Sequence, residues 1–312
     1  MYTIYKQCTT NQTCHNTALG PKVSQIYSII VCCMSEISKT TANKQQYVAP
    51  DTTNLMASVK KVAITICPRS LMITGYGDGG NVLAVRYSDY NNVHSDWIID
   101  FFEHQFLNEP LLSDPNKIIA AFIGTEKNIV VPAALYNTET AQQWLAATHY
   151  IENDDVVTTH PLGSNKAHYI YAWPLMIKDL LKRYFPKAKA YPLAAYQFTK
   201  NNSTNATIHC CISSQEAFIT ILAPGGSLLW HEVVKYGLAE DIAYRIHAGC
   251  KQHNISNYTV RCTALSPELV FILHKLSPYF EQMLVGESQS YLNASGWDSS
   301  LFLSKQIYQC VS

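Results

Sequence analysis

Two stretches of the chain, VAITICPRSLMITGYGDGGNVL at residues 62–83 and IHCCISSQEAFITILAPGGSLL at residues 208–229, carry one pattern at a constant offset. The glycine pair at 79–80 then falls on the glycine pair at 225–226. Both pairs stand where two apolar runs need a tight turn. Each copy continues through a third apolar segment into a helical pattern, so the sequence predicts two related β-β-β-α modules.

Composition limits the classes of function. The chain has 312 residues, enough for two domains with their own cores. It is 47% hydrophobic and 15% charged, with a formal net charge of zero. Since no basic excess is present to neutralise phosphates or to attract an anionic membrane, we expect no nucleic-acid partner. We also expect no insertion into a membrane, because the apolar run near the start of the chain is too short for a transmembrane helix.

The ten cysteines do not form a recognisable framework. Two vicinal pairs occur at residues 32–33 and 210–211, and no C-x-x-C or zinc-ligand spacing is present. We therefore expect small apolar cysteines in a reducing compartment, which indicates a cytoplasmic protein without a metal site.

Residues 1–56 differ from the rest of the chain because they are rich in Thr, Asn, Gln and Ser. Their one apolar run, residues 23–34, is too short for a transmembrane helix. We predict a poorly ordered extension that folding does not need, either native or lying upstream of a start at Met56.

The first module is predicted over residues 57–200. After its three strands, Ser95 or Asp96 is expected to cap a helix that ends at Leu107. The apolar run KIIAAFIG at residues 117–124 is typical of a strand buried on both faces. Further strands are expected at 128–132, 156–160 and 168–173, and further helices at 138–148 and 174–184.

The second module is predicted over residues 201–284, after a polar linker at residues 200–205. It contains three strands, a helix at 238–250, a strand at 258–263 and an amphipathic helix that starts near Ser266. Ser277 and Pro278 are expected to begin a second short helix reaching Leu284, and residues 285–312 are expected to form a C-terminal tail.

Three antiparallel strands, a helix, a buried strand and another helix form a ribonuclease-H-like unit, and two such units in tandem give the actin-like ATPase architecture. Further features of the sequence are VPAALY at residues 131–136, the second Gly-Gly turn, Asp241 with Tyr244, and the pattern at residues 265–280. In these features the chain resembles an uncharacterised, chiefly Bacteroidetes family that has this fold and a domain-of-unknown-function label. A more distant similarity is to the actin-like scaffold of pilus-assembly machines. The resemblance implies a mixed α/β fold of duplicated ribonuclease-H-like domains and no particular activity.

The turns that would hold a nucleotide in this fold lack the required residues. Phosphates need backbone N–H groups in both first hairpins and a carboxylate that organises the metal. The first turn reads ICPRS at residues 66–70 and the second ISSQE at residues 212–216, with no D-x-G pattern in either. Residues 262–266 also lack the glycine pair of an adenosine site. We therefore expect no catalytic residues and no ATP hydrolysis.

Other candidate sites have simpler structural explanations. The glycine cluster at residues 75–80 opens no helix, so a hairpin turn explains it better than a phosphate loop. Asp241 is expected to offset its helix dipole and to pair with Arg245. His231 and Glu232 are neighbours on a strand and should face opposite sides. A metal site from the acids at 154–155 with the histidines at 160 and 168 remains an alternative.

The sequence therefore favours a non-catalytic binding or scaffold protein that needs no cofactor and acts on a protein partner. Its working surface is predicted in the interdomain cleft, since ligands prefer domain interfaces. The residues expected near the cleft floor are Arg69, Tyr76, Ser213, Ser214 and Gln215. The alternative is a divergent nucleotide- or metal-dependent phosphotransferase that uses non-standard cleft residues.

Overall fold

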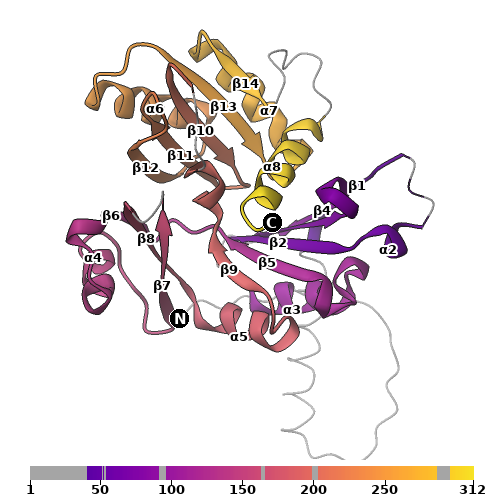
Figure 1. Cartoon of the computed structure of the whole chain (residues 1–312). Coiled ribbons are helices and arrows are strands. Elements are labelled where there is room, and N and C mark those ends of the chain that lie inside the picture. Colours follow the sequence, from indigo (N-terminus) through magenta and orange to yellow (C-terminus); the bar gives the residue numbers. More distant parts are fainter. Residues whose placement is uncertain are drawn as a thin grey trace, which may run out of the picture. The chain divides into compact units, whose positions relative to one another are not determined.

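The computed structural model describes residues 41–50, 52, 54–90, 96–162, 166–198, 203–286 and 296–312, and residues 41–312 form one unit. The strands of this unit form three sheets (Figure 1). The apolar run at residues 23–34 and the first half of the predicted linker, residues 200–202, lie outside the described residues.

The first sheet has six strands in the order β1-β4-β3-β2-β5-β9. Its strands are β1 (Thr41–Val48), β2 (Lys61–Cys67), β3 (Ser70–Tyr76), β4 (Val82–Tyr90), β5 (Ile118–Ile123) and β9 (Lys189–Pro192). The second sheet has five strands in the order β12-β11-β10-β13-β14. These are β10 (Ala206–Ile212), β11 (Glu216–Leu222), β12 (Leu228–Lys235), β13 (Tyr258–Ala264) and β14 (Met283–Val285).

The predicted repeat is confirmed in the pairing of the strands. Each of these two sheets contains three antiparallel strands that follow one another in the chain, β2 to β4 and β10 to β12. The first of the three also pairs in parallel with a later strand, β2 with β5 and β10 with β13. Ile66 pairs with Leu71 in the first copy, and the corresponding Ile212 pairs with Ala217 in the second. A register shift follows Gly75 in one copy and the corresponding residue 221 in the other. The glycines of both pairs have positive φ, between 74° and 86°, which glycine adopts without a steric penalty.

A third, small sheet follows β5 and contains β6 (Asn128–Pro132), β7 (Asp155–Leu162) and β8 (Ala167–Pro174) in the order β6-β8-β7. One of its faces packs on helix α4 (Ala141–Ala146) through Leu145 and Ile170. The other face joins the core beneath the first sheet through Tyr169 and Tyr171.

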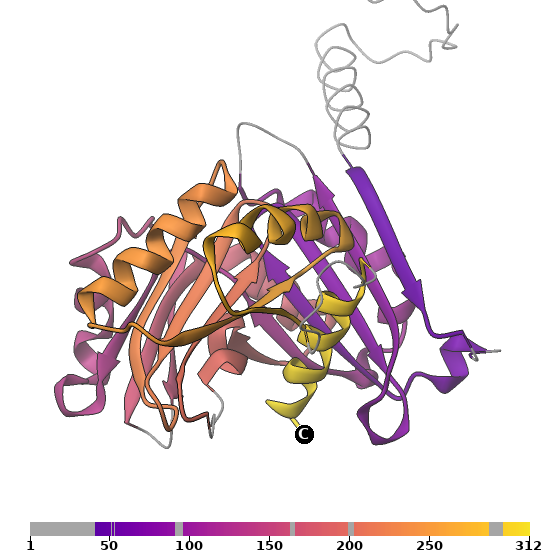
Figure 2. The same cartoon turned by 90° about the horizontal axis from the view of Figure 1, so that it is seen from above.

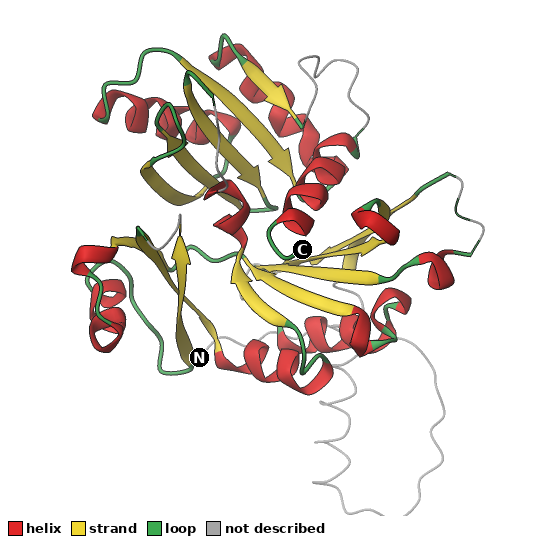
Figure 3. Cartoon of the chain, in the orientation of Figure 1, coloured by secondary structure: helices red, strands yellow, loops and turns green. Residues whose placement is uncertain are grey.

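Helices cover the outer faces of the two large sheets (Figure 3). Helices α3 (Ile99–Asn108) and α5 (Leu175–Tyr184) pack beneath the first sheet, and α6 (Ala239–Gln252) and α7 (Val270–Leu276) pack on the second. The apolar side chains of β2 alternate between two cores: Val62 and Ile64 join α3 and α5, whereas Ala63 and Cys67 face the second half of the chain. A short helix, α2 (Leu55–Ser58), precedes β2.

Two segments that the sequence placed outside the modules belong to the structure. Strand β1 lies inside the extension predicted to end at residue 56 and pairs with β4 along the edge of the first sheet. Helix α8 (Asp298–Gln309) lies inside the predicted tail, packs against β13 and β4, and buries Leu303 and Ile307 (Figure 2). The sequence pattern missed both because each segment is rich in polar residues and is held by contacts with elements that are distant in the chain.

Two local predictions are also wrong. Asp96 does not cap α3, whose N-cap is Ile98, because the Asp96 carboxylate pairs with Arg69 instead. The short helix expected after Ser277 is a single 3₁₀ turn at Ser277–Tyr279, followed by strand β14. Pro278 begins that turn, and β14 then pairs in parallel with β13.

Candidate functional site

The turns of the two equivalent hairpins, β2–β3 and β10–β11, lie at the junction of the two halves and define the hairpin junction. Pro68 and Arg69 form the first turn, and Arg69 has a φ of 65°. This arrangement is a type II turn, which has proline at its second position and usually glycine at its third. The Arg69 backbone N–H donates to the Asp96 carbonyl at 2.9 Å, and the Arg69 carbonyl accepts from the Tyr90 N–H at 3.0 Å. These two bonds hold a residue other than glycine in a left-handed conformation.

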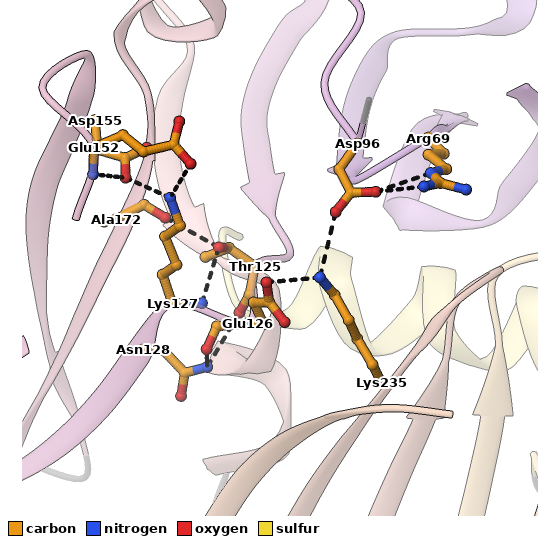
Figure 4. A network of polar contacts seen from close by, with 10 residues as sticks. All are labelled: Arg69, Asp96, Thr125, Glu126, Lys127, Asn128, Glu152, Asp155, Ala172 and Lys235. Atoms are coloured by element: carbon orange, nitrogen blue, oxygen red, sulfur yellow. Dashed lines mark hydrogen bonds and ion pairs between the residues drawn. The ribbon is translucent and has the colours of Figure 1, made fainter. Parts of the chain in front are cut away.

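Four charged side chains join the halves at this junction (Figure 4). The Arg69 guanidinium contacts Asp96 Oδ1 at 2.7 and 2.9 Å. Lys235 Nζ, at the end of β12, lies 3.3 Å from Asp96 Oδ2 and 2.8 Å from Glu126 Oε1. Burial opposes the ionisation of Asp96, but hydrogen bonds from Arg69 and Lys235 outweigh it and lower the Asp96 pKa. Two positive and two negative groups therefore neutralise one another at the position where the turns meet.

A buried carboxyl group lies behind this network. Glu216 is the first residue of β11 and is only 1% exposed. Neither of its carboxyl oxygens has a hydrogen-bond partner among the described residues. Burial, helped by the charge of Glu126 and opposed by that of Lys235, raises the Glu216 pKa to about 8. The carboxyl group is therefore largely protonated at neutral pH.

Hydroxyl groups from both copies lie at the same junction. Ser70 occupies the position in the first copy that Glu216 occupies in the second. The hydroxyls of Ser70 and Ser214 lie near the buried Tyr87 hydroxyl, but in the described part of the chain none of the three has a hydrogen bond of good geometry. Burial raises the pKa of the Tyr87 hydroxyl well above its usual value, so this group stays neutral. The junction thus combines a surface ion-pair network with an unsatisfied polar interior.

The structure brings Arg69, Ser213, Ser214 and Gln215 to the junction, in the two turns. Ser213 is fully used by its own turn, because its hydroxyl donates to the Glu216 carbonyl at 3.1 Å and accepts from the Glu216 N–H at 3.0 Å. The Tyr236 N–H donates to the Gln215 carbonyl at 3.2 Å and its hydroxyl donates to the Ser213 carbonyl at 2.6 Å. These contacts fix the second turn against the end of β12.

Tyr76 lies elsewhere. It stands at the far end of β3, about 20 Å from the first turn at 3.3 Å per residue. Its side chain is fully buried beneath α8, where its hydroxyl donates to the Ser304 carbonyl at 2.8 Å. Tyr76 therefore anchors the C-terminal helix and does not line the junction. The sequence missed Glu216, Asp96, Lys235 and Glu126, although the correspondence of Glu216 with Ser70 was visible in the repeat.

The remaining candidates from the sequence are not assembled into a site. Asp155 binds Lys127 at 2.6 Å, His168 stacks on Tyr136, and His160 contacts the edge of Tyr191. In the part of the chain that is described, no group of three or more His, Cys, Asp or Glu residues is placed to hold a metal ion.

Asp241 and the pair His231–Glu232 have structural roles. Asp241 Oδ2 accepts from the N–H groups of Gly237 and Leu238 at 3.0 and 2.9 Å, so it caps α6. The expected pair with Arg245 is absent, because Arg245 contacts Glu232 at 3.6 Å. His231 points the other way and bonds to Thr220 and Tyr169, so the two neighbours face opposite sides as predicted.

Comparison with known structures identifies the class of fold. A Bacteroides thetaiotaomicron protein described as having an actin-like ATPase fold and unknown function superimposes with a TM-score of 0.64 at 14% identity, covering 80% of this chain and 98% of that one. A type IV pilus biogenesis complex, PilM–PilN, contributes a chain with a TM-score of 0.50 at 11% identity, covering 82% and 99%. The protein therefore has the actin-like ATPase fold, as the duplicated modules predicted.

The family follows from the sequence. Residues 50–280 match the family described as Protein of unknown function (DUF3822), and the chain belongs to that family. No curated protein sequence matches it. Within the described ranges, no helix is long and apolar enough to cross a membrane.

Proposed function

We propose that this protein is a non-catalytic member of the actin-like fold that works as a cytoplasmic binding or scaffold protein for another protein. The observation that carries the proposal is the ion-pair network at the hairpin junction. Arg69 lies in the first turn and Lys235 at the end of β12, and each is already paired with a carboxylate of the chain. A phosphate entering this position would have to displace Asp96 or Glu126.

The turns themselves support the same proposal. Pro68 has no N–H to donate to a phosphate, and the Ser213 hydroxyl is already used within its own turn. Glu216 would repel an anionic ligand once it is ionised. The free, buried thiols of Cys67, Cys210 and Cys262 are consistent with a reducing compartment.

A second candidate function rests on Glu216. A buried carboxyl group with a pKa near neutrality is typical of a general acid or base. The second candidate is therefore a divergent phosphotransferase in which the network opens and the ionised form of Glu216 accepts a proton from the substrate. Structural carboxyl groups can be perturbed in the same way, so the nucleotide experiment below decides between the two functions.

The deciding measurement is the melting temperature of the full chain with Mg-ATP, Mg-ADP or Mg-GTP, repeated with EDTA. A protein whose hairpin junction binds no nucleotide should show no shift, because a ligand stabilises only the state that it binds. A shift of several degrees with one nucleotide, lost in the double variant Ser213→Ala, Ser214→Ala, would overturn the proposal and favour the phosphotransferase. The matched control is Ser277→Ala, which removes an exposed hydroxyl far from the junction in sequence.

A further inference from the structure

A pocket of about 750 Å³ lies between the edge of the small sheet and the β11–β12 turn, separate from the hairpin junction. Strand β6 and the segment that follows α4 contribute one wall, and Leu228 to His231 of β12 contribute the other. A volume of this size is within the range of pockets that enclose a drug-sized ligand or a short peptide.

The described lining is mainly apolar and carries a single charged side chain. Ile129 and Val130 of β6 line the pocket together with Phe198 and Leu229, and Leu229 is 36% exposed. Lys166 supplies the charge, and no acidic residue is present among the described lining residues. An apolar ligand that carries a carboxylate complements this lining.

Both walls of the pocket are edge strands. Strand β6 ends the small sheet, β12 ends the second sheet, and the two lie near each other without pairing. The bond from the Ala172 N–H to the Lys127 carbonyl shows that odd-numbered residues of β6 bond to β8. The N–H and C=O groups of Val130 therefore point away from β8, towards the open edge. His149 Nε2 donates to the Asn128 carbonyl at 2.9 Å, so the first outward position of β6 is already occupied.

His231, which lines the pocket, belongs to a fixed chain of polar groups that lies behind the lining. The Thr220 hydroxyl donates to Gln197 Oε1 at 2.6 Å, so it accepts from His231 Nδ1–H at 2.8 Å. His231 Nε2 then accepts from the Tyr169 hydroxyl at 3.2 Å. Burial lowers the His231 pKa to about 3, so the imidazole stays neutral. Both ring nitrogens of His231 therefore have hydrogen-bond partners within the protein. The free edge of β6 and Lys166 are left to recognise a ligand.

We propose that this pocket docks an extended peptide segment of the protein partner, which adds to the free edge of β6 at Val130. Its apolar side chains enter the pocket against Leu229 and Phe198, and an acidic residue faces Lys166. Addition of a strand to an exposed edge provides main-chain hydrogen bonds, and the pocket provides selectivity for the side chains. This inference rests on the proposed partner-binding function and names the class of partner.

The test uses a random peptide library displayed on phage and selected against the full chain. Enriched sequences should combine alternating apolar residues with an acidic residue, and synthetic copies should protect the Val130 amide from hydrogen exchange. Leu229→Asp and Lys166→Glu should each weaken binding by about tenfold or more. The matched controls are Leu107→Asp, which alters a more exposed leucine of α3, and Lys251→Glu at the end of α6, and both should bind as the wild type does.

The inference is overturned if no peptide sequence is enriched, or if the enriched peptides bind the two pocket variants as tightly as the wild type. It is also overturned if a small apolar carboxylate raises the melting temperature of the protein and no peptide binds. These outcomes leave the proposed function intact, because that function is judged separately by the nucleotide melting experiment. A nucleotide shift with intact peptide docking would reject the non-catalytic assignment and keep the pocket.

Discussion

The buried Glu216 carboxyl group should make the protein less stable as the pH rises, the reverse of the usual behaviour of a carboxylate. Its pKa is about 8 in the folded protein, compared with the ordinary value of 4.5 that applies to the unfolded chain. Between these two values the folded state binds the proton more tightly than the unfolded state, so the free energy of unfolding falls. At 1.36 kcal/mol per pKa unit, the total loss is on the order of 5 kcal/mol, of which about 2 kcal/mol falls between pH 6.5 and 8.

The assay is urea denaturation of the wild type and Glu216→Gln at a series of pH values, with the free energy of unfolding taken from midpoint and slope. Gln keeps the volume of the side chain and cannot ionise. Subtracting the two curves removes the contributions of all other groups, including His209 and His231, whose lowered pKa values act in the opposite direction. The variant should gain stability relative to the wild type as the pH rises from 4.5 to 8. A difference that stays flat across this range would refute the burial of an unpaired carboxyl group.

Two further predictions concern the segments that the structure added to the modules. Gly79→Ala and Gly80→Ala share a left-handed backbone, which costs about 1–2 kcal/mol for alanine. Only the Gly80 change also drives a methyl group into the Tyr308 ring of α8, so its loss in urea stability should be larger by about 1–3 kcal/mol, and equal losses would argue against this packing. A chain that begins at Met56 lacks β1, and its melting temperature should be several degrees below that of a chain that begins at Thr41. Each kcal/mol of stability lost with the β1–β4 pairing should lower the melting temperature by about 2–4 °C. Equal melting temperatures would show that β1 contributes nothing to the sheet.

The sequence by itself determined the repeated architecture. Continuous apolar runs show that β2 and β10 are buried strands, and the glycine pairs fix where the second hairpin of each copy turns, so the repeated fold could be predicted. These signals are local, since each depends on residues close together in the chain. The same reading placed Arg69 and Ser214 at the junction because each lies in a predicted hairpin turn.

Only the tertiary structure decided the chemistry of the junction and the extent of the sheet. Arg69 and Asp96 are 27 positions apart, and Lys235 lies 139 positions from Asp96 and 109 from Glu126. No sequence period links residues at such separations, so their pairing follows from how the two sheets meet. Tyr76 was misplaced for the same reason, because the covering helix α8 comes from the far end of the chain. The free edge of β6 likewise exists only because the small sheet ends there, which a pattern within one strand does not encode.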